Sequence, residues 1–364
     1  MIYIHVPFCH RKCTYCAFYS HGAPASRRQT LYVDNLIEEM RQRRGEQSHP
    51  IRTVYFGGGT PSILPLEQLT RIVDALHECF DLSQVEEVTL EANPEDLTVD
   101  YLQGLRNIGL VNRLSIGIQT LDDEMLRLIG RRHTAQQALD AVQNAYDAGF
   151  HNISVDFIYG LPLHFQSSFF NFQLVTHVSA YALTVEPGTA LARQVEQGRV
   201  VLPGDDEVVR QYFALHDTLI AKGFVQYEVS NYCRPGCHSR HNSRYWDRTP
   251  YLGLGPGAHS FDGLHRRWNG PMGAESGEWR VENEETLTDD DAFNELLMTS
   301  LRTTRGIPLD MVPDKYKEEL HRKIQPYIAC GWIVERSEVG GMRCEPTTEG
   351  LLYADGMAAD LFLA

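Results

Sequence analysis

The first half of the chain alternates short β-rich runs with helical patterns, and this alternation restricts the fold more than any other feature. Six such runs lie at 2–6, 53–56, 85–90, 113–118, 152–158 and 179–185. A strand, a helix and a second strand form a unit with parallel strands. Because the runs are apolar enough to be buried on both faces, they predict an α/β fold: a partial (β/α)6 barrel, open on one side. A doubly wound parallel sheet is the alternative.

Chemically distinctive residues follow most of these runs. A cysteine cluster follows the first run, Gly57-Gly58-Gly59-Thr60 follows the second, and Glu91 closes the third. Gln119 ends the fourth run, and Asp156 lies within the fifth. The carboxyl ends of parallel strands meet at one edge of a barrel, where active sites are built. We therefore expect a site at this edge.

The pattern changes after about residue 190. A helix over 206–223 and a strand over 225–230 precede an irregular stretch, 231–270, that is rich in arginine, histidine, glycine and aromatic residues. Residues 275–295 carry nine acidic residues and one arginine, which is most simply a solvated linker. The tail predicts two helices, a hairpin and a last helix, a small α+β module of winged-helix character. Three regions are expected: a barrel over 1–190, its extension over 191–274, and the acidic linker with a C-terminal domain over 275–364.

Composition excludes several function classes. The 364 residues include 33 lysines and arginines against 48 acidic residues, a net charge of −15, which argues against a nucleic-acid partner. No apolar run reaches 18 residues, so we expect no integral membrane segment. The opening apolar stretch is too short for a signal sequence, and we expect a cytoplasmic protein.

Three of the eight cysteines lie within eight residues, spaced Cx3Cx2C. Soft thiolates suit zinc and iron–sulfur clusters. A [4Fe–4S] cube normally takes four thiolates, so three would leave one iron open for another ligand. Structural zinc is the alternative, with His5 or His10 as the fourth ligand. A second zinc-like set occurs later in the chain: Cys233, Cys237, His238 and His241.

The Cx3Cx2C motif after an N-terminal strand resembles the radical SAM superfamily. In that superfamily the open iron binds S-adenosylmethionine (SAM), and the cluster can deliver an electron that cleaves it to a radical. The segments IYIHVPFC, YFGGGTPS, EANPE, SIGIQ, DFIYGLP and AYALTVEPGT look like those of oxygen-independent coproporphyrinogen III oxidase and its relatives, the HemN/HemW family. The resemblance implies that the cluster ligands are Cys9, Cys13 and Cys16. It implies SAM contacts at Tyr3, Tyr15, Gly58, Gly59, Thr60, Glu91, Gln119, Arg131 and Asp156.

The residue types suit these implied roles. Glycines allow close approach of the backbone to a ligand. Glu91 and Asp156 can accept hydrogen bonds from ribose hydroxyls, and Arg131 can hold the SAM carboxylate. In the alternative interpretation the two acids are structural acceptors at buried strand ends, and Arg131 is a solvated charge at a helix end.

Two departures separate the chain from the oxidases. The motif of the oxidases looks like Cx3Cx2CxC, whereas Phe18 stands in place of the fourth cysteine here. The chain also starts at its first strand, without the extension that the oxidases carry. Residues 241–246 read HNSRYW and look like the HNxxYW signature of the heme chaperones in this family. That resemblance implies heme contact by His241, Asn242, Tyr245 and Trp246.

The chemistry of this segment is compatible with heme. Imidazole is a common axial ligand of heme iron, and large aromatic rings offer flat faces to a porphyrin. Residues 233–248 hold four arginines and one aspartate, and guanidinium groups pair well with propionates. The alternative is a polar loop on the barrel rim in which His241 only makes hydrogen bonds.

The resemblance favours a heme chaperone that transfers heme to acceptor hemoproteins and carries a SAM-bound [4Fe–4S] cluster. Respiratory enzymes are candidate acceptors, which would imply peripheral membrane contact, and an electron donor is a further expected partner. Cleavage of SAM is possible in principle, so enzymatic activity is left open. The alternative is a coproporphyrinogen oxidase that decarboxylates its substrate by radical chemistry to protoporphyrinogen IX, and Phe18 speaks against it. Radical-mediated heme breakdown is a third class.

Overall fold

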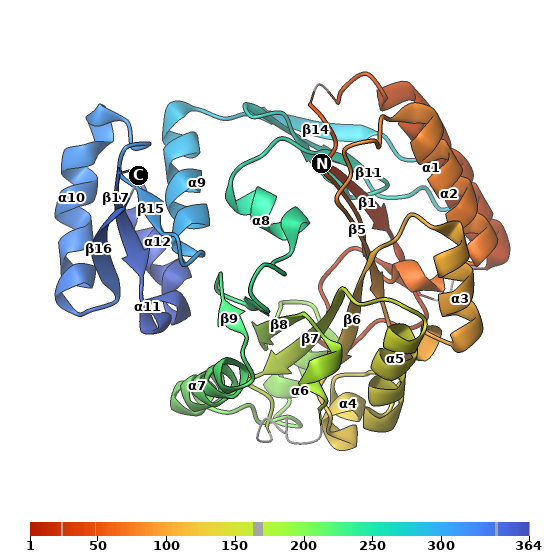
Figure 1. Ribbon diagram of the computed structural model, residues 1–364, viewed down its shortest axis with the longest axis horizontal. Helices are drawn as coiled ribbons and strands as arrows, with labels where there is room; N and C mark the ends of the chain where they lie inside the picture. The colour runs from red at the N-terminus through yellow and green to blue at the C-terminus, as the bar shows by residue number, and fades with distance from the viewer. Residues whose placement is uncertain (23–24, 48, 163–169, 339–340, 364) are drawn as a thin grey trace.

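Six parallel strands form the centre of the protein. The computed structural model describes residues 1–22, 25–47, 49–162, 170–338 and 341–363. The strands lie side by side in chain order, each parallel to the next, and curve into an open barrel (Figure 1). They are β1 (Ile2–Val6), β4 (Thr53–Gly58), β5 (Glu87–Ala92), β6 (Arg113–Gln119), β7 (Ile153–Tyr159) and β8 (His177–Ala182). The predicted partial (β/α)6 barrel is confirmed.

Helices follow the strands, and most of them cover the convex face of the sheet (Figure 1). They are α1 (Ser26–Arg43), α2 (Leu66–Cys79), α3 (Val99–Ile108), α4 (Asp123–Leu128), α5 (Ala135–Asp147), α6 (Ala190–Glu196) and α7 (Asp205–Ala221). Single turns of 3₁₀ helix lie at Pro61–Ile63, Pro94–Asp96 and Phe172–Leu174. Thr134 and Gln137 form a reciprocal capping box that starts α5. None of the described helices is long and apolar enough to cross a membrane.

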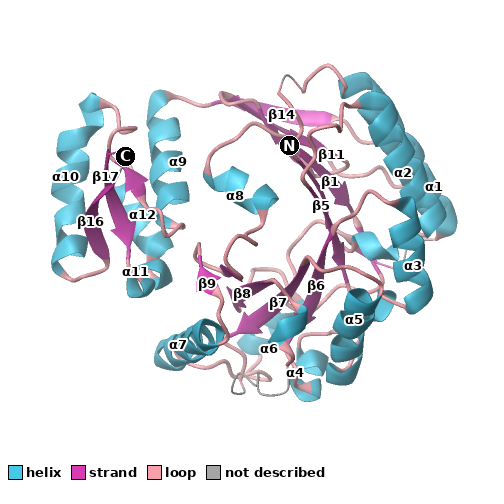
Figure 2. Cartoon of the chain, in the orientation of Figure 1, coloured by secondary structure: helices cyan, strands magenta, loops and turns pink. Residues whose placement is uncertain are grey.

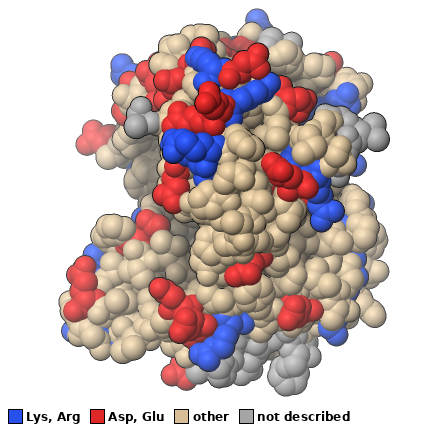
Figure 3. Space-filling view, turned by 90° about the vertical axis from the view of Figure 1, so that its left-hand side faces the viewer, with Lys and Arg blue, Asp and Glu red and all other residues tan. Residues whose placement is uncertain are grey.

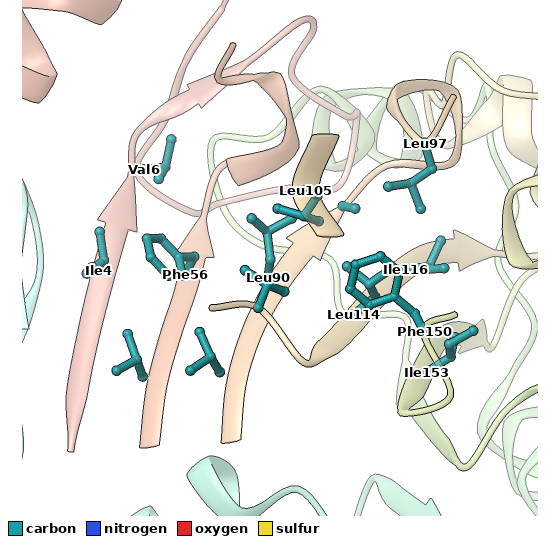
Figure 4. Packing of buried hydrophobic residues seen from close by; sticks show 14 of the residues in the cluster. Ile4, Val6, Phe56, Leu90, Leu97, Leu105, Leu114, Ile116, Phe150 and Ile153 are labelled. Atoms are coloured by element: carbon teal, nitrogen blue, oxygen red, sulfur yellow. The ribbon is translucent and has the colours of Figure 1, made fainter. Parts of the chain in front are cut away.

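The central strands are buried on both faces, as expected, but the two faces differ in polarity. Alternate side chains of a strand point to opposite faces. The outer set, which includes Ile4, Phe56, Leu90 and Ile116, packs against the helices (Figure 4). The inner set is polar and mutually bonded: Tyr3, His5, Thr53, Tyr55, Thr89, Glu91, Arg113, Ser115, Ser154, Asp156 and His177. The barrel interior is therefore a hydrogen-bonded layer beneath the site.

The stretch 231–270 is more ordered than the sequence predicts. Short strands extend the sheet at both edges: β11 (Leu252–Leu254) parallel to β1, and β10 (Asn231–Cys233) antiparallel to β8, followed by β9 (Val225–Gln226). Between them, α8 (Arg240–Trp246) lies in the opening of the barrel (Figure 1). The expected irregular loop is wrong here because three-residue strands gain their stability from neighbours distant in sequence.

The acidic segment is a strand rather than a linker. β14 (Val281–Thr286) forms a three-stranded antiparallel sheet with β13 (His265–Asn269) and β12 (His259–Phe261) (Figure 2). Its side chains are exposed, as in a linker, but opposite charges pair across the strands. Arg266 meets Glu285 at 3.2 Å and Arg267 meets Glu284 at 3.2 Å.

The C-terminal domain has its own hydrophobic core. It contains α9 (Asp289–Leu301), β15 (Ile307–Pro308), α10 (Asp314–Ala329), β16 (Ile333–Glu338), β17 (Gly341–Pro346), α11 (Thr348–Leu352) and α12 (Ala354–Leu361). The order of helices and hairpin agrees with the predicted α+β module, to which β15 adds a third strand. On the face shown in Figure 3, acidic and basic side chains lie in small mixed groups with uncharged surface between them.

Candidate functional site

A cavity of about 650 Å³ opens at the carboxyl ends of the barrel strands. All three cysteines of the Cx3Cx2C motif line it. Eight of the nine predicted SAM residues line it too: Tyr15, Gly58, Gly59, Thr60, Glu91, Gln119, Arg131 and Asp156. The structure therefore gathers at one site most of the residues that the sequence singled out.

Backbone hydrogen bonds anchor the cysteine loop to two helices. Thr14 donates its amide to the carbonyl of Ile129 and its hydroxyl to the carbonyl of Leu128, both at 3.0 Å. Leu191, in α6, donates to the Thr14 carbonyl at 2.8 Å. The loop begins in β2 (Phe8–Cys9), which pairs with β3 (His21–Gly22). These contacts hold the three thiols at the rim of the barrel.

Two hydrogen-bond donors face the thiols. The Thr60 hydroxyl lies 3.6 Å from the Cys9 sulfur, and an Arg131 nitrogen lies 3.6 Å from the Cys13 sulfur. Burial raises the pKa of the Cys9 and Cys16 thiols, and a bound metal would favour their thiolate forms. Three soft ligands with donors to sulfur fit a [4Fe–4S] cluster.

The zinc alternatives need histidine ligands, and these histidines have other partners. His5 contacts the Tyr3 hydroxyl and the Tyr19 carbonyl, and His10 lies 3.2 Å from Asp96. In the described ranges, no three His, Cys, Asp or Glu side chains converge on a single ion. A [4Fe–4S] cube does not need three side chains to converge on one ion, because each thiolate binds a separate iron.

The glycine motif brings strands together. A Cβ on Gly59 would lie 2.5 Å from the Phe8 carbonyl oxygen, and the Gly59 amide donates to Val6 at 2.8 Å. Gly58 has a φ of +109°, and a Cβ there would lie 2.6 Å from the His5 ring. The close approach seen here joins two segments of the chain, and contact of these glycines with a ligand stays a prediction. The motif fixes β4 against the segment that carries Cys9.

Arg131 is partly buried and hydrogen-bonded, which contradicts the alternative of a solvated charge. Its guanidinium donates to Asn93 Oδ1 at 2.6 Å and to the Gly117 carbonyl at 2.7 Å, and its buried Nε has no partner among the described residues. Asn93 also donates to Thr60 at 3.2 Å. Sequence reasoning missed Asn93, although it lies in the EANPE segment. A partly buried cation with an unused donor suits an anionic group such as the SAM carboxylate.

Gln119 occupies a strained position at the end of β6. Its φ of +63° lies in the left-handed region, and the pairing with β7 is irregular between Gly117 and Gln119. Such a conformation costs about 1–3 kcal/mol in a non-glycine residue. The bulge turns Gln119 into the cavity, and strain of this kind is common at functional sites.

Two partly buried carboxyl groups line the cavity. Glu91 accepts a hydrogen bond from the Tyr55 hydroxyl at 2.8 Å, and Asp156 accepts one from Ser115 at 3.4 Å. Burial raises the pKa of Glu91 to about 7 and that of Asp156 to about 6. Polar groups of a ligand, such as ribose hydroxyls, can complete their hydrogen bonding.

The raised pKa of Glu91 predicts a pH-dependent stability. The folded state holds a proton that the unfolded state releases above pH 4.5, so this stabilisation is complete below pH 4.5 and lost as pH rises through 7. Glu91→Gln should therefore gain about 1 kcal/mol relative to wild type between pH 6 and pH 8. Urea unfolding at both pH values measures it, with the exposed Glu67→Gln as control. A stability difference between Glu91→Gln and wild type that is the same at pH 6 and pH 8 would contradict the raised pKa of Glu91.

Tyr3 is the one predicted SAM residue that does not line the cavity, and its contact with SAM stays a prediction. Its hydroxyl lies 3.1 Å from His5 Nδ1, and its ring stacks on Tyr55 inside the barrel. A Cβ on Gly57 would lie 3.0 Å from this ring, so the Tyr3 side chain lies beneath the glycine motif.

Phe18 is 71% exposed and lines the cavity.

His241 is a buried residue of the barrel interior. Its side chain is 1% exposed, with one ring nitrogen 2.8 Å from the Thr53 hydroxyl and the other 3.1 Å from the Tyr245 hydroxyl. Burial lowers its pKa to about 3. The Glu87 carboxylate accepts from its amide at 2.9 Å and so caps α8. This placement matches the hydrogen-bonding alternative, and heme contact by His241 stays a prediction.

The rest of the HNxxYW segment leads toward the C-terminal domain. Asn242 donates its amide to Ser239, the N-cap of α8, and the Tyr245 ring packs on Tyr251. Trp246 lies below the Arg302 guanidinium at 5.8 Å, and its buried indole N–H has no partner in the part of the chain that the structure describes. Three of the four nearby arginines are already engaged: Arg234 with backbone carbonyls, Arg240 with Glu86, and Arg248 with Glu295.

Replacement of His241 should affect folding. His241→Ala removes two hydrogen bonds and a buried ring, and we expect a loss of about 2–4 kcal/mol in the free energy of unfolding. The exposed His321→Ala should change stability by less than about 0.5 kcal/mol. Urea unfolding of both variants measures the effect. Unchanged stability with lost heme binding would instead make His241 a direct ligand.

The strands, the cavity and its thiols together define a radical SAM protein. Residues 3–168 match the radical SAM superfamily. The coproporphyrinogen III oxidase HemN from Escherichia coli, described as a radical SAM enzyme, superposes with a TM-score of 0.81 at 22% identity. That match covers 99% of this chain and 89% of HemN, and it supports the fold.

More similar sequences identify the family. The chain is 36% identical over 330 residues to the heme chaperone HemW of Lactococcus lactis, covering 86% of this chain and 84% of that protein. It is 34% identical to HemW of Mycobacterium tuberculosis, covering 99% and 94%. A mitochondrial radical S-adenosyl methionine domain-containing protein 1 of Bos taurus is 36% identical, covering 85% and 69%. The chain belongs to the HemW family of radical SAM proteins.

Proposed function

We propose that this protein binds heme and transfers it to acceptor hemoproteins. The observation that carries the proposal is the 34–36% identity to proteins named heme chaperone HemW, which spans most of both chains. The similarity includes the C-terminal domain, so it is more than a shared cofactor site. The negative net charge and the absence of a membrane-spanning helix among the described residues are compatible with a cytoplasmic carrier.

The thiol-lined cavity is the proposed site of a [4Fe–4S] cluster and SAM. Cys9, Cys13 and Cys16 would hold three irons, and the fourth iron would bind SAM. Arg131 would neutralise the SAM carboxylate, while Glu91 and Asp156 would accept hydrogen bonds from its ribose. When bound, the cluster supplies an electron that can cleave SAM. Tyr15, Gly58, Gly59, Thr60 and Gln119 complete the proposed cofactor walls.

Coproporphyrinogen oxidation is the second candidate function. The fold of HemN and the thiol-lined cavity favour it. Phe18 opposes it, because this exposed aromatic residue occupies the position of the fourth cysteine in the oxidase-type motif. A phenyl ring can neither ligate iron nor exchange protons at the mouth of the cavity.

Heme transfer can be distinguished from simple dissociation. Heme-loaded protein is mixed with excess apomyoglobin, which measures spontaneous release, and separately with the apo form of a b-type respiratory hemoprotein. A chaperone delivers heme to its acceptor faster than to apomyoglobin, with a rate that rises with acceptor concentration. Equal rates for every apo-hemoprotein would mean that the chain only stores heme.

A further inference from the structure

A second cavity of about 650 Å³ lies between the end of α8 and the C-terminal domain. Its walls come from Trp246 at the end of α8, Arg248 after α8, Phe293 in α9, Met311 after β15, and Arg343 in β17. Figure 1 shows α8 facing α9 across this boundary. Of the described residues, none lines both this cavity and the thiol-lined one. Its volume falls within the roughly 300–1,000 Å³ typical of small-molecule sites.

The charges around this cavity favour an anionic ligand. Four cationic side chains line it against two aspartates, on a chain whose net charge is −15. Three of the four cations are paired: Arg248 with Glu295 at 3.1 Å, Arg305 with Asp247 at 2.5 Å, and Lys315 with Asp289 at 2.9 Å. Arg343 donates only to backbone carbonyls, those of residues 305 and 306, in the described part of the chain. Its charge is therefore not neutralised by a carboxylate.

The cavity also has apolar lining and one sulfur-containing side chain. Trp246, Phe293 and Pro308 line it, and the indole N–H of Trp246 is buried without a partner among the described residues. Met311 is 64% exposed, which is unusual for a long apolar side chain. Among the described lining residues it alone carries a sulfur or imidazole group of the kind that ligates heme iron.

We propose that this cavity is the heme site, with Met311 as an iron ligand. The propionates meet Arg305 and Arg343, whose guanidinium groups suit carboxylates, and the ring lies against Trp246. His241 then positions α8, and hence Trp246, from inside the barrel. This inference rests on the proposed function, since it names the place and the contacts of the heme.

The propionate contacts are tested with two probes, hemin and hemin dimethyl ester, on the full chain with its cluster reconstituted. Wild type should bind hemin more tightly than the ester. Arg305→Gln should weaken hemin binding about tenfold and leave the ester unaffected. Asp247→Asn should tighten hemin binding several-fold, because it releases Arg305. Arg322→Gln, an exposed change on α10, is the control and should alter neither affinity.

The iron ligand is tested by absorption spectra of the heme-loaded protein. Met311→Leu should shift the heme bands, whereas Met298→Leu, on α9 outside this cavity, should leave them unchanged. Thermal melts confirm that both variants fold. Bound heme with identical spectra and affinities in the Met311 and Arg305 variants would overturn the inference while the proposed function stands. If wild type binds no heme, the proposed function fails and the inference fails with it.

Discussion

Replacement of any one of Cys9, Cys13 and Cys16 by serine should abolish the [4Fe–4S] cluster. The three thiols line one cavity, with Thr60 and Arg131 donating toward sulfur. A cube that loses one of three protein thiolates loses the ligand of one iron, and serine is a harder ligand. We expect iron and sulfide to fall from about four of each per chain to below one after anaerobic reconstitution. Metal analysis and visible absorption measure this.

Cys237→Ser is the matched control for the cluster. Cys237 is a partly exposed free thiol that does not line the cavity, so its loss should leave the iron content unchanged. Retention of iron in a Cys13→Ser variant would contradict the assignment. Stoichiometric zinc without sulfide in the wild type would instead support the zinc alternative.

Gly59→Ala should be among the most destabilising single substitutions in the barrel. The added methyl group would lie 2.5 Å from the Phe8 carbonyl oxygen, where backbone cannot move without breaking the Gly59–Val6 hydrogen bond. Overpacking against rigid backbone costs about 3 kcal/mol or more. Because Phe8 precedes Cys9, the cluster should also be lost more readily on exposure to a chelator. Urea unfolding and iron-release rates measure the two effects.

Gly45→Ala provides the comparison for this clash. A Cβ on Gly45 has no heavy atom within 4 Å, so the substitution should change the free energy of unfolding by less than about 1 kcal/mol. Equal behaviour of the two alanine variants would show that the close approach at Gly59 is not needed.

The sequence predicts the barrel well because its signals are local. Each outer set of apolar residues, such as Ile2, Ile4 and Val6, packs against a helix that follows in the chain. The polar inner set was present as alternate residues, Tyr3 and His5 among them, but short apolar runs hide this alternation. The predicted site residues come together because strand ends of a parallel sheet share one edge.

The misplaced features depend on partners far apart in the sequence. β14 consists of exposed, mostly polar residues, and it is a strand because its backbone pairs with β13, whose arginines meet its acidic side chains. His241 reads as an exposed ligand until Thr53 and Glu87, over 150 residues earlier, enclose it. The partial burial of Arg131 likewise depends on Asn93 and Gly117. Pairwise contacts of this range leave no periodic pattern in the chain.

The proposal that this protein carries heme rather than makes its precursor is tested by one anaerobic experiment. Cluster-reconstituted protein is divided: one part is titrated with heme, and the other receives coproporphyrinogen III, SAM and a reductant. The account predicts heme binding at one equivalent per chain and no vinyl-containing product. Turnover of coproporphyrinogen with SAM cleavage, and no tight heme binding, would contradict it and make the chain an oxidase despite Phe18.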